Sequence, residues 1–206
     1  MKRMDIYLKV SNFSDLLKTN LMFFNGELQE TYYYGAPWGK GEDQNDHALV
    51  STKNLVELTE KYRIFTTNGQ SSYNDFNTDQ RSYLIFYIEN KTYEKISNNL
   101  LNDKRIWCAF IFRKNKNICD IFSIVSSLND KKRVVLTKDC GNPYSIWTCN
   151  GDAREYDETF YENINEIVKN TIYCIIICKE WNKEPTADSI LLEHLHNLEE
   201  TFIKLE

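Results

Sequence analysis

Three uninterrupted apolar runs constrain the fold more than any other feature of this sequence. They lie at residues 81–89 (RSYLIFYIE), 105–112 (RIWCAFIF) and 171–178 (TIYCIIIC), and all three are rich in β-branched or aromatic side chains. Runs of this length and composition are typical of buried β-strands. We therefore predict three buried strands, with the isoleucine-rich third strand at the centre of a sheet. No run approaches the roughly 18–20 apolar residues that a membrane helix needs.

Helical patterns separate and flank these strands. Residues 92–101 fit a helix between the first two strands, so that strand, helix and strand follow one another. Capping residues and apolar spacing predict four more helices. These are a short helix capped by Ser14 that stops near Asn25, a helix capped by Ser51 or Thr52, a helix over residues 157–169, and an amphipathic helix over residues 186–206.

The remaining segments are more polar. Residues 63–66 fit a short strand, and residues 67–79 (TNGQSSYNDFNTD) are so dense in turn formers that they are expected to form a loop. Further short strands are expected over residues 118–125 and 133–137. Taken together, the pattern predicts one domain over residues 1–206, of the α+β class, with a mixed sheet and helices packed on at least one face.

The overall charge limits the kinds of partner. The formal net charge is −5, so the chain as a whole repels nucleic acid, which is not the expected partner. The N-terminal residues lack a secretion signal, and no membrane association is expected. The six cysteines contain no C-x-x-C pair, which favours reduced thiols and an intracellular, cytoplasmic location. The heavy use of Asn, Lys and Ile suits an AT-rich genome, so a viral or effector protein acting in a host cytoplasm or nucleus is one interpretation.

The residues that usually carry chemistry do not form a recognisable constellation. His194 and His196 are two positions apart and cannot bind one metal ion together from a helix. No glycine-rich phosphate loop is present. Four acids between residues 152 and 158 could act in acid/base chemistry or bind a cation, or they could simply complement a helix N-terminus; they are Asp152, Glu155, Asp157 and Glu158. The prediction is of no catalytic residues and no metal site.

One long polar segment is unusually aromatic. Tyr32, Tyr33, Tyr34 and Trp38 lie close together between residues 30 and 46. Such side chains can stack on a flat ligand or anchor a partner protein, and they can equally cover the edge of the core. These four residues are the candidate partner-binding site.

The segment LVELTEKYRIFTTNGQSS, residues 55–72, resembles the C-terminal regulatory domain of eukaryotic methylenetetrahydrofolate reductase and small uncharacterised proteins that share its motif. The motif is carried by residues 65–71, and the resemblance extends over about residues 36–182 through the strand, helix, strand order and a segment around Trp147. In that family the domain binds S-adenosylmethionine and has no catalytic residues. The resemblance therefore implies Thr66, Asn68, Gln70 and Trp147 as ligand-binding residues, and S-adenosylmethionine as the one cofactor to consider.

This chain departs from the family pattern at two positions. Gly69 stands where the family has a serine, and Ile146 stands where it has a threonine. Each lost hydroxyl removes a hydrogen bond worth about 0.5–1.5 kcal/mol. These two departures weaken the case for S-adenosylmethionine, and a shared fold alone does not establish a shared function.

Three functions follow as hypotheses. The first is a non-enzymatic binding or regulatory module that acts through a protein partner or through self-association as a homo-oligomer. The second is a small-molecule sensor for S-adenosylmethionine or a nucleoside, and the third is a carboxylate-dependent enzyme. The absence of a catalytic constellation and the aromatic segment favour the first.

Overall fold

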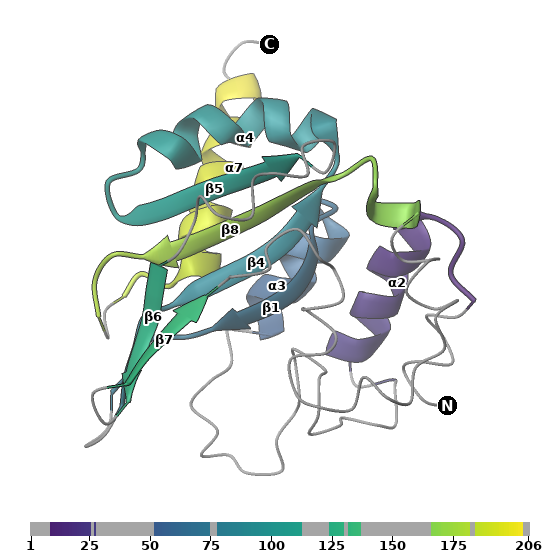
Figure 1. Ribbon diagram of the computed structural model, residues 1–206. Helices are drawn as coiled ribbons and strands as arrows, with labels where there is room; N and C mark the ends of the chain where they lie inside the picture. Colours follow the sequence, from purple (N-terminus) through teal and green to yellow (C-terminus); the bar gives the residue numbers. More distant parts are fainter. Residues whose placement is uncertain are drawn as a thin grey trace.

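The computed structural model describes residues 9–25, 27, 52–74, 78–112, 124–129, 132–136, 166–181 and 184–203. Helices and strands both contribute, which confirms the predicted α+β class (Figure 1). In chain order the elements are α2 (Phe13–Phe24), α3 (Thr52–Glu60), β1 (Phe65–Gln70), β2 (Tyr73–Asn74), β3 (Thr78–Gln80), β4 (Tyr83–Ile88), α4 (Asn90–Asn102), β5 (Ile106–Phe112), β6 (Ile124–Asn129), β7 (Lys132–Leu136), β8 (Ile172–Cys178) and α7 (Ala187–Ile203).

The main sheet has the strand order β1-β4-β8-β5. The three apolar runs form β4, β5 and β8, and β8 lies between the other two, as predicted for the isoleucine-rich run. The mixed sheet is a correction, because each strand pairing in this sheet is antiparallel. Helix α4 returns the chain so that β5 runs in the direction of β4, but β8 occupies the place between them and runs the opposite way. The two parallel strands are therefore not neighbours.

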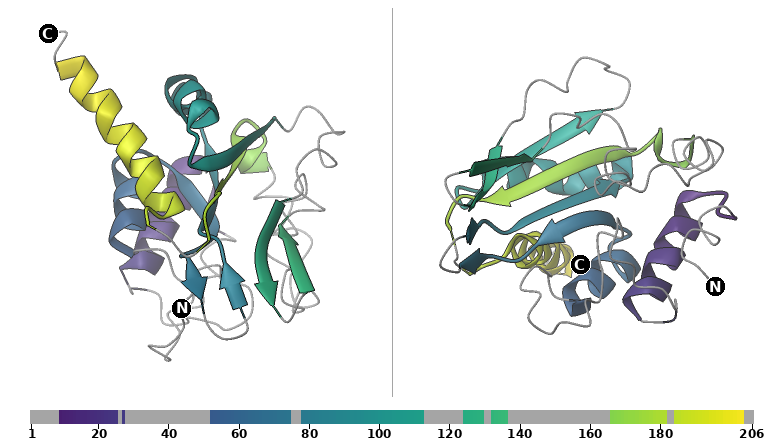
Figure 2. Two further views of the ribbon diagram at one scale, coloured as in Figure 1. Left: turned by 90° about the vertical axis from the view of Figure 1, so that its left-hand side faces the viewer. Right: turned by 60° about the horizontal axis from the view of Figure 1, so that its bottom comes forward.

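Alternation along the strands explains why the runs are apolar throughout. Successive side chains point to opposite faces of a sheet. On β4, Leu84 and Phe86 belong to one buried cluster together with residues of α3, α4 and α7. Tyr83 and Ile85 belong to a second buried cluster on the opposite face. Strand β4 is thus buried on both faces. Helices α3, α4 and α7 pack on one face, and Phe13, Leu16 and Leu17 of α2 belong to the cluster on the other, the side on which the β6–β7 hairpin also lies (Figure 2).

The segment predicted as a loop over residues 67–79 is largely extended. Strand β1 continues through Thr67 to Gln70 because it pairs with β4, and a register irregularity between Thr66 and Asn68 accommodates the pairing. Strands β2 and β3 then join β6 and β7 in a second antiparallel sheet. Pairing with distant strands supplies the backbone hydrogen bonds here and outweighs the turn propensity of the side chains.

The helix predicted to be capped by Ser14 begins earlier. Helix α2 starts at Phe13, and Asn12 is its cap: the Asp15 amide donates to Asn12 Oδ1 at 3.0 Å. Asp15 Oδ2 in turn accepts from the amide of Ser11, the residue before the cap, at 3.1 Å. A buried hydrogen bond from Asn20 Nδ2 to the Thr66 carbonyl, 2.8 Å long, joins α2 to β1.

Helix α7 closes one face of the sheet, and it begins after Thr186 as predicted. The Ala187 amide donates to Ser82 Oγ at 2.8 Å, which ties the start of the helix to the segment before β4. Leu191 and Leu195 are buried against the sheet, so the amphipathic character expected of this helix is confirmed where it is described. Among the described residues, no helix has both the length and the apolar character needed to cross a bilayer.

Candidate functional site

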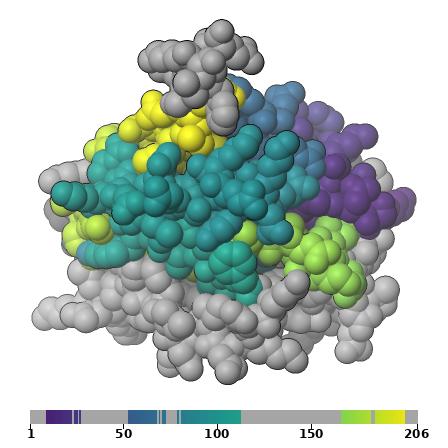
Figure 3. All heavy atoms as spheres, turned by 90° about the horizontal axis from the view of Figure 1, so that it is seen from above, coloured from purple at the N-terminus to yellow at the C-terminus, as the bar shows by residue number. Residues whose placement is uncertain are grey.

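A pocket opens where three helices meet on the face of the molecule that carries α7. The end of α3, the start of α4 and the outer side of α7 surround a cavity of about 510 Å³, and these helices adjoin on the surface in Figure 3. We call it the α3–α4–α7 pocket. Its lining is formed by Lys61, Tyr62, Arg63, Glu89, Lys91, Thr92, Lys95, Ile96, Leu195, Leu198 and Glu199.

The charges of this pocket oppose those of the whole chain. Its lining has four cationic and two anionic side chains, a formal charge of +2, while the chain carries −5. Both carboxylates already have cationic partners. Arg63 Nε lies 3.0 Å from Glu89 Oε2, and Lys61 Nζ lies 2.7 Å from Glu199 Oε2. The pocket is therefore an electropositive region on an acidic protein.

The first turn of α4 adds to the positive potential. Glu89 occupies the cap position with extended backbone, but its side chain makes no capping hydrogen bond and faces Arg63 instead. The first turn contains no acidic residue, although acids there would complement the helix dipole. Lys91 lies in that turn and Lys95 one turn later, a like-charged pair at i, i+4 that disfavours the helix.

Arg63 is held in an unusual backbone conformation. Its φ angle is 57°, in the left-handed region where glycine or asparagine is the usual choice. The chain reverses here after α3, and the Ile64 amide donates to the Leu58 carbonyl at 2.9 Å. A larger residue in this conformation costs roughly 1–2 kcal/mol. The turn places the guanidinium at the wall of the pocket beside Glu89.

Tyr62 forms part of the apolar wall. Lys61 Nζ lies 4.9 Å from the centre of the Tyr62 ring, and the ring of His196 is 5.9 Å away on α7. The Tyr62 hydroxyl is enclosed and makes no hydrogen bond of acceptable geometry. Burial raises the pKa of this phenol, with Lys61 acting in the opposite direction. Ile96, Leu195 and Leu198 continue the apolar wall across α4 and α7.

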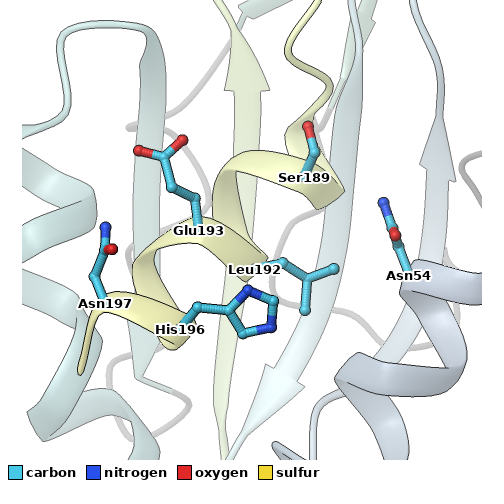
Figure 4. A pocket seen from close by; sticks show the side chains of 6 residues that line it. All are labelled: Asn54, Ser189, Leu192, Glu193, His196 and Asn197. Carbon is cyan, nitrogen blue, oxygen red and sulfur yellow. The ribbon is translucent and has the colours of Figure 1, made fainter. Parts of the chain in front are cut away.

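A second, smaller hollow lies between α3 and α7. Its volume is about 350 Å³, and Figure 4 shows Asn54 on α3 and the other lining residues on α7. Leu192 and His196 extend toward the side on which Asn54 stands. The full lining is Asn54, Ser189, Leu192, Glu193, His196 and Asn197.

Serine, histidine and carboxylate in one hollow are the residue types of a hydrolytic relay, but their hydrogen bonds lead elsewhere. Ser189 Oγ donates to the Thr186 carbonyl at 2.8 Å, within the first turn of α7. His196 Nε2 lies 2.6 Å from Glu57 Oε1 on α3. A nucleophile needs a base within hydrogen-bond reach. The bonds made by Ser189 and His196 connect α7 to itself and to α3, so this hollow carries a structural role.

The other helix histidine belongs to a charged network at the far end of α4. Asp103 Oδ2 lies 2.8 Å from His194 Nε2 and 2.7 Å from Arg105 Nη2, and Arg105 also reaches Glu193 at 2.8 Å. The Asp103 side chain is only 6% exposed. Burial acts to raise the pKa of this carboxyl, but the hydrogen bonds from Arg105 and His194 outweigh it and hold the pKa well below its usual range. The network fastens α7 to the turn between α4 and β5.

The structure places the predicted ligand residues as follows. Thr66 is 0% exposed on β1, and its carbonyl accepts from Asn20. Asn68 and Gln70 lie on the same strand, but their side chains are outside the described part of the structure. Trp147 also lies outside the described residues, as does Ile146, which replaces the threonine of the family pattern. Of the four residues, the structure therefore describes only the side chain of Thr66, and that side chain lies in the interior.

The remaining predicted residues divide in the same way. The aromatic group Tyr32, Tyr33, Tyr34 and Trp38 lies outside the described residues, as do Asp152, Glu155, Asp157 and Glu158. Within the described ranges, no group of three or more histidine, cysteine and acidic residues could hold a metal ion. Burial raises the pKa of the Cys108 thiol to about 12 and that of Cys178 to about 11. These thiols are therefore unreactive at neutral pH.

The sequence analysis missed the residues of the α3–α4–α7 pocket. Helix α4 was predicted over residues 92–101, and it begins two residues earlier, at Asn90, so that Lys91 lies in its first turn, where a basic residue opposes the helix dipole. The proximity of Lys91 and Lys95 to Arg63 and Glu199 depends on how α3, α4 and α7 pack, and the spacing of residues along the chain does not contain that information.

Comparison with known proteins adds no further constraint. No known protein family matches this sequence, and no curated protein is detectably similar to it.

Proposed function

We propose that this protein is a non-enzymatic binding module that holds a small anionic ligand in the α3–α4–α7 pocket. The observation that carries this proposal is the gathering of four cationic side chains around one cavity of ligand size, at a helix N-terminus without a capping side chain. Cavities of about 300–1,000 Å³ are typical of small-molecule sites. A bound anion would offset the unfavourable placement of Lys91 and Lys95.

Among the three hypotheses, this proposal favours the small-molecule sensor. It replaces S-adenosylmethionine with an anion as the expected ligand. S-adenosylmethionine carries a sulfonium and an ammonium cation, both of which the positive potential of this pocket disfavours. Nucleoside phosphates and other organic anions suit it better. The role of Thr66, Asn68, Gln70 and Trp147 in binding S-adenosylmethionine remains a separate proposal that rests on the family resemblance alone.

Calorimetric titration with pyrophosphate at low ionic strength tests the proposal. We expect saturable binding that is lost in Lys91→Glu and retained in Lys104→Glu, a matched reversal at the exposed turn beyond the other end of α4. A ligand at 100 times its Kd stabilises a protein by about 2.7 kcal/mol. This corresponds to about 5–10 °C in Tm for a chain of this size. Equal heats in the wild type and both variants, or no heat at all, would refute it.

Self-association through strand β5 is a second candidate function. Among the described strands, β5 pairs with β8 alone and forms one edge of its sheet. Phe112 at the end of this strand is 40% exposed. Apolar edge strands readily pair with another chain. We expect light scattering after gel filtration to detect a dimer that Phe112→Lys weakens; a 24 kDa species alone at high concentration would exclude it.

We also infer that the protein works in a reducing, intracellular environment. Three of the six cysteines are described, and Cys108, Cys174 and Cys178 are free thiols on strands of the main sheet. Mass spectrometry of the native protein after alkylation under denaturing conditions tests this, because all six thiols should then be modified without prior reduction.

A further inference from the structure

We propose that the ligand of the α3–α4–α7 pocket is a phosphate monoester with an apolar substituent. The phosphate group would lie beside Lys91, Lys95 and Arg63, and the substituent would lie against Leu198 of α7 and the Tyr62 ring. This inference rests on the proposed function and narrows its ligand from small anions in general to one chemical class.

The size of the pocket favours an organic ligand over an inorganic ion. A phosphate ion has five heavy atoms, each no larger than a water molecule, whose share of the liquid is about 30 Å³. It would therefore occupy at most about 150 Å³ of a cavity of about 510 Å³. Most of the pocket would remain for the group to which the phosphate is attached.

The charge of the pocket favours a phosphate ester over a carboxylate. The lining carries a formal charge of +2, and a phosphate monoester carries about −1.5 to −2 at pH 7. A carboxylate carries a charge of −1 and has two acceptor oxygens. A phosphate monoester has three terminal acceptor oxygens. Lys91, Lys95, Arg63 and the hydroxyl of Thr92 can supply donors to all three. The charge of the lining and the number of its hydrogen-bond donors therefore both match a phosphate monoester better than a carboxylate.

The apolar wall favours a substituent without charge. Ile96, Leu195 and Leu198 lie on the α4 and α7 sides of the pocket, and the Tyr62 ring lies at the end of α3. Ile96 and Leu195 already pack in the core, so the accessible apolar contacts come from Leu198 and the Tyr62 ring, which are partly buried. An alkyl or aryl group would cover these two side chains better than a sugar or a second phosphate.

The test compares inorganic phosphate, phenyl phosphate and adenosine monophosphate by calorimetry on the full chain. We expect phenyl phosphate to bind at least about tenfold more tightly than inorganic phosphate, and more tightly than adenosine monophosphate, whose sugar is polar. Leu198→Ala should remove most of this difference and leave the affinity for inorganic phosphate unchanged, whereas Lys91→Glu should abolish binding of all three. Circular dichroism checks that both variants fold.

The outcomes separate this inference from the proposed function. If inorganic phosphate and phenyl phosphate bind equally well, or if adenosine monophosphate binds best, the apolar substituent is wrong while the anion site stands. If no compound binds, both are wrong. If phenyl phosphate binds tightly and Leu198→Ala has no effect, the substituent does not contact α7 and the inference is overturned.

Discussion

The guanidinium of Arg63 lies 3.0 Å from the carboxylate of Glu89, the residue that precedes α4. This ion pair turns the side chain of Glu89 away from the backbone amides that it would otherwise cap. Removing Arg63 would therefore do more than delete one positive charge, because Glu89 would become free to neutralise the start of the helix.

The first prediction concerns Arg63→Asn. Asparagine suits the left-handed backbone better than arginine, and this gain opposes the loss of the exposed ion pair with Glu89 and of the exposed hydrogen bond to Ser14. The free energy of unfolding should therefore change by no more than about 1 kcal/mol. Affinity for phenyl phosphate should fall at least about tenfold, because a donor is lost and Glu89 is released. Urea unfolding and calorimetry measure the two effects. A stable variant with undiminished affinity would show that Arg63 has no part in binding.

Lys91→Glu should make the protein more stable while it abolishes anion binding. Glutamate in the first turn complements the helix dipole and removes the repulsion between Lys91 and Lys95, a gain of about 0.3–1 kcal/mol. For a chain of this length the Tm should rise by about 1–3 °C. Thermal unfolding in the absence of ligand measures this, with Lys104→Glu as the control. A fall in Tm would contradict the view that Lys91 is retained for binding at the expense of stability.

Asp103 should make stability depend on acidity. Its folded-state pKa is depressed, so its contribution is fully present above the unfolded pKa near 4 and is lost as the pH falls below that value. Asp103→Ala should cost about 1–3 kcal/mol at pH 7, because hydrogen bonds from Arg105 and His194 are lost. The cost should shrink at pH 2–3. Urea unfolding at both pH values measures it, with Glu94→Ala on the exposed side of α4 as a control; an equal cost at both pH values would exclude the charge as its source.

S-adenosylmethionine should give no saturable change in Tm at millimolar concentration. The pocket is electropositive, and the hydroxyl of Thr66, the one predicted contact whose side chain is described, is buried in the core. A thermal-shift titration tests this. A saturable shift that Thr66→Ala abolishes would support the ligand implied by the family resemblance and would require β1 to open to its ligand.

The sequence predicted β4 and β8 well because these two strands are buried throughout. Strand β5, predicted as a third buried strand, lies at the edge of the sheet and is mostly half-buried. Continuous runs such as IYCIIIC can be buried throughout only at the centre of a sheet, and β8 lies there. Order and direction were not predictable from the runs themselves. The mixed sheet was wrong because β8, which follows β5 by 59 residues, inserts between two strands that are close in sequence. The polar segment from Thr67 was predicted as a loop because its side chains favour turns. It forms a strand because β4 supplies backbone hydrogen bonds that local propensity does not indicate.

The candidate site was less predictable than the fold. Lys61 and Arg63 at the end of α3, Lys91 and Lys95 at the start of α4, and Glu199 on α7 come from three segments that only tertiary packing brings together. Each residue alone is an ordinary surface charge. Lys91 lies in the first turn of α4, where a basic residue opposes the helix dipole, and this placement bears on the proposed site only once the pocket is known.

The most direct test of the account is calorimetric titration of phenyl phosphate into the full chain and into Lys91→Glu at low ionic strength. We expect phenyl phosphate to bind saturably at one site per chain in the wild type and in Lys104→Glu, and not to bind Lys91→Glu. Binding of equal strength in all three proteins, or no binding to the wild type, would contradict the assignment of the α3–α4–α7 pocket as an anion site.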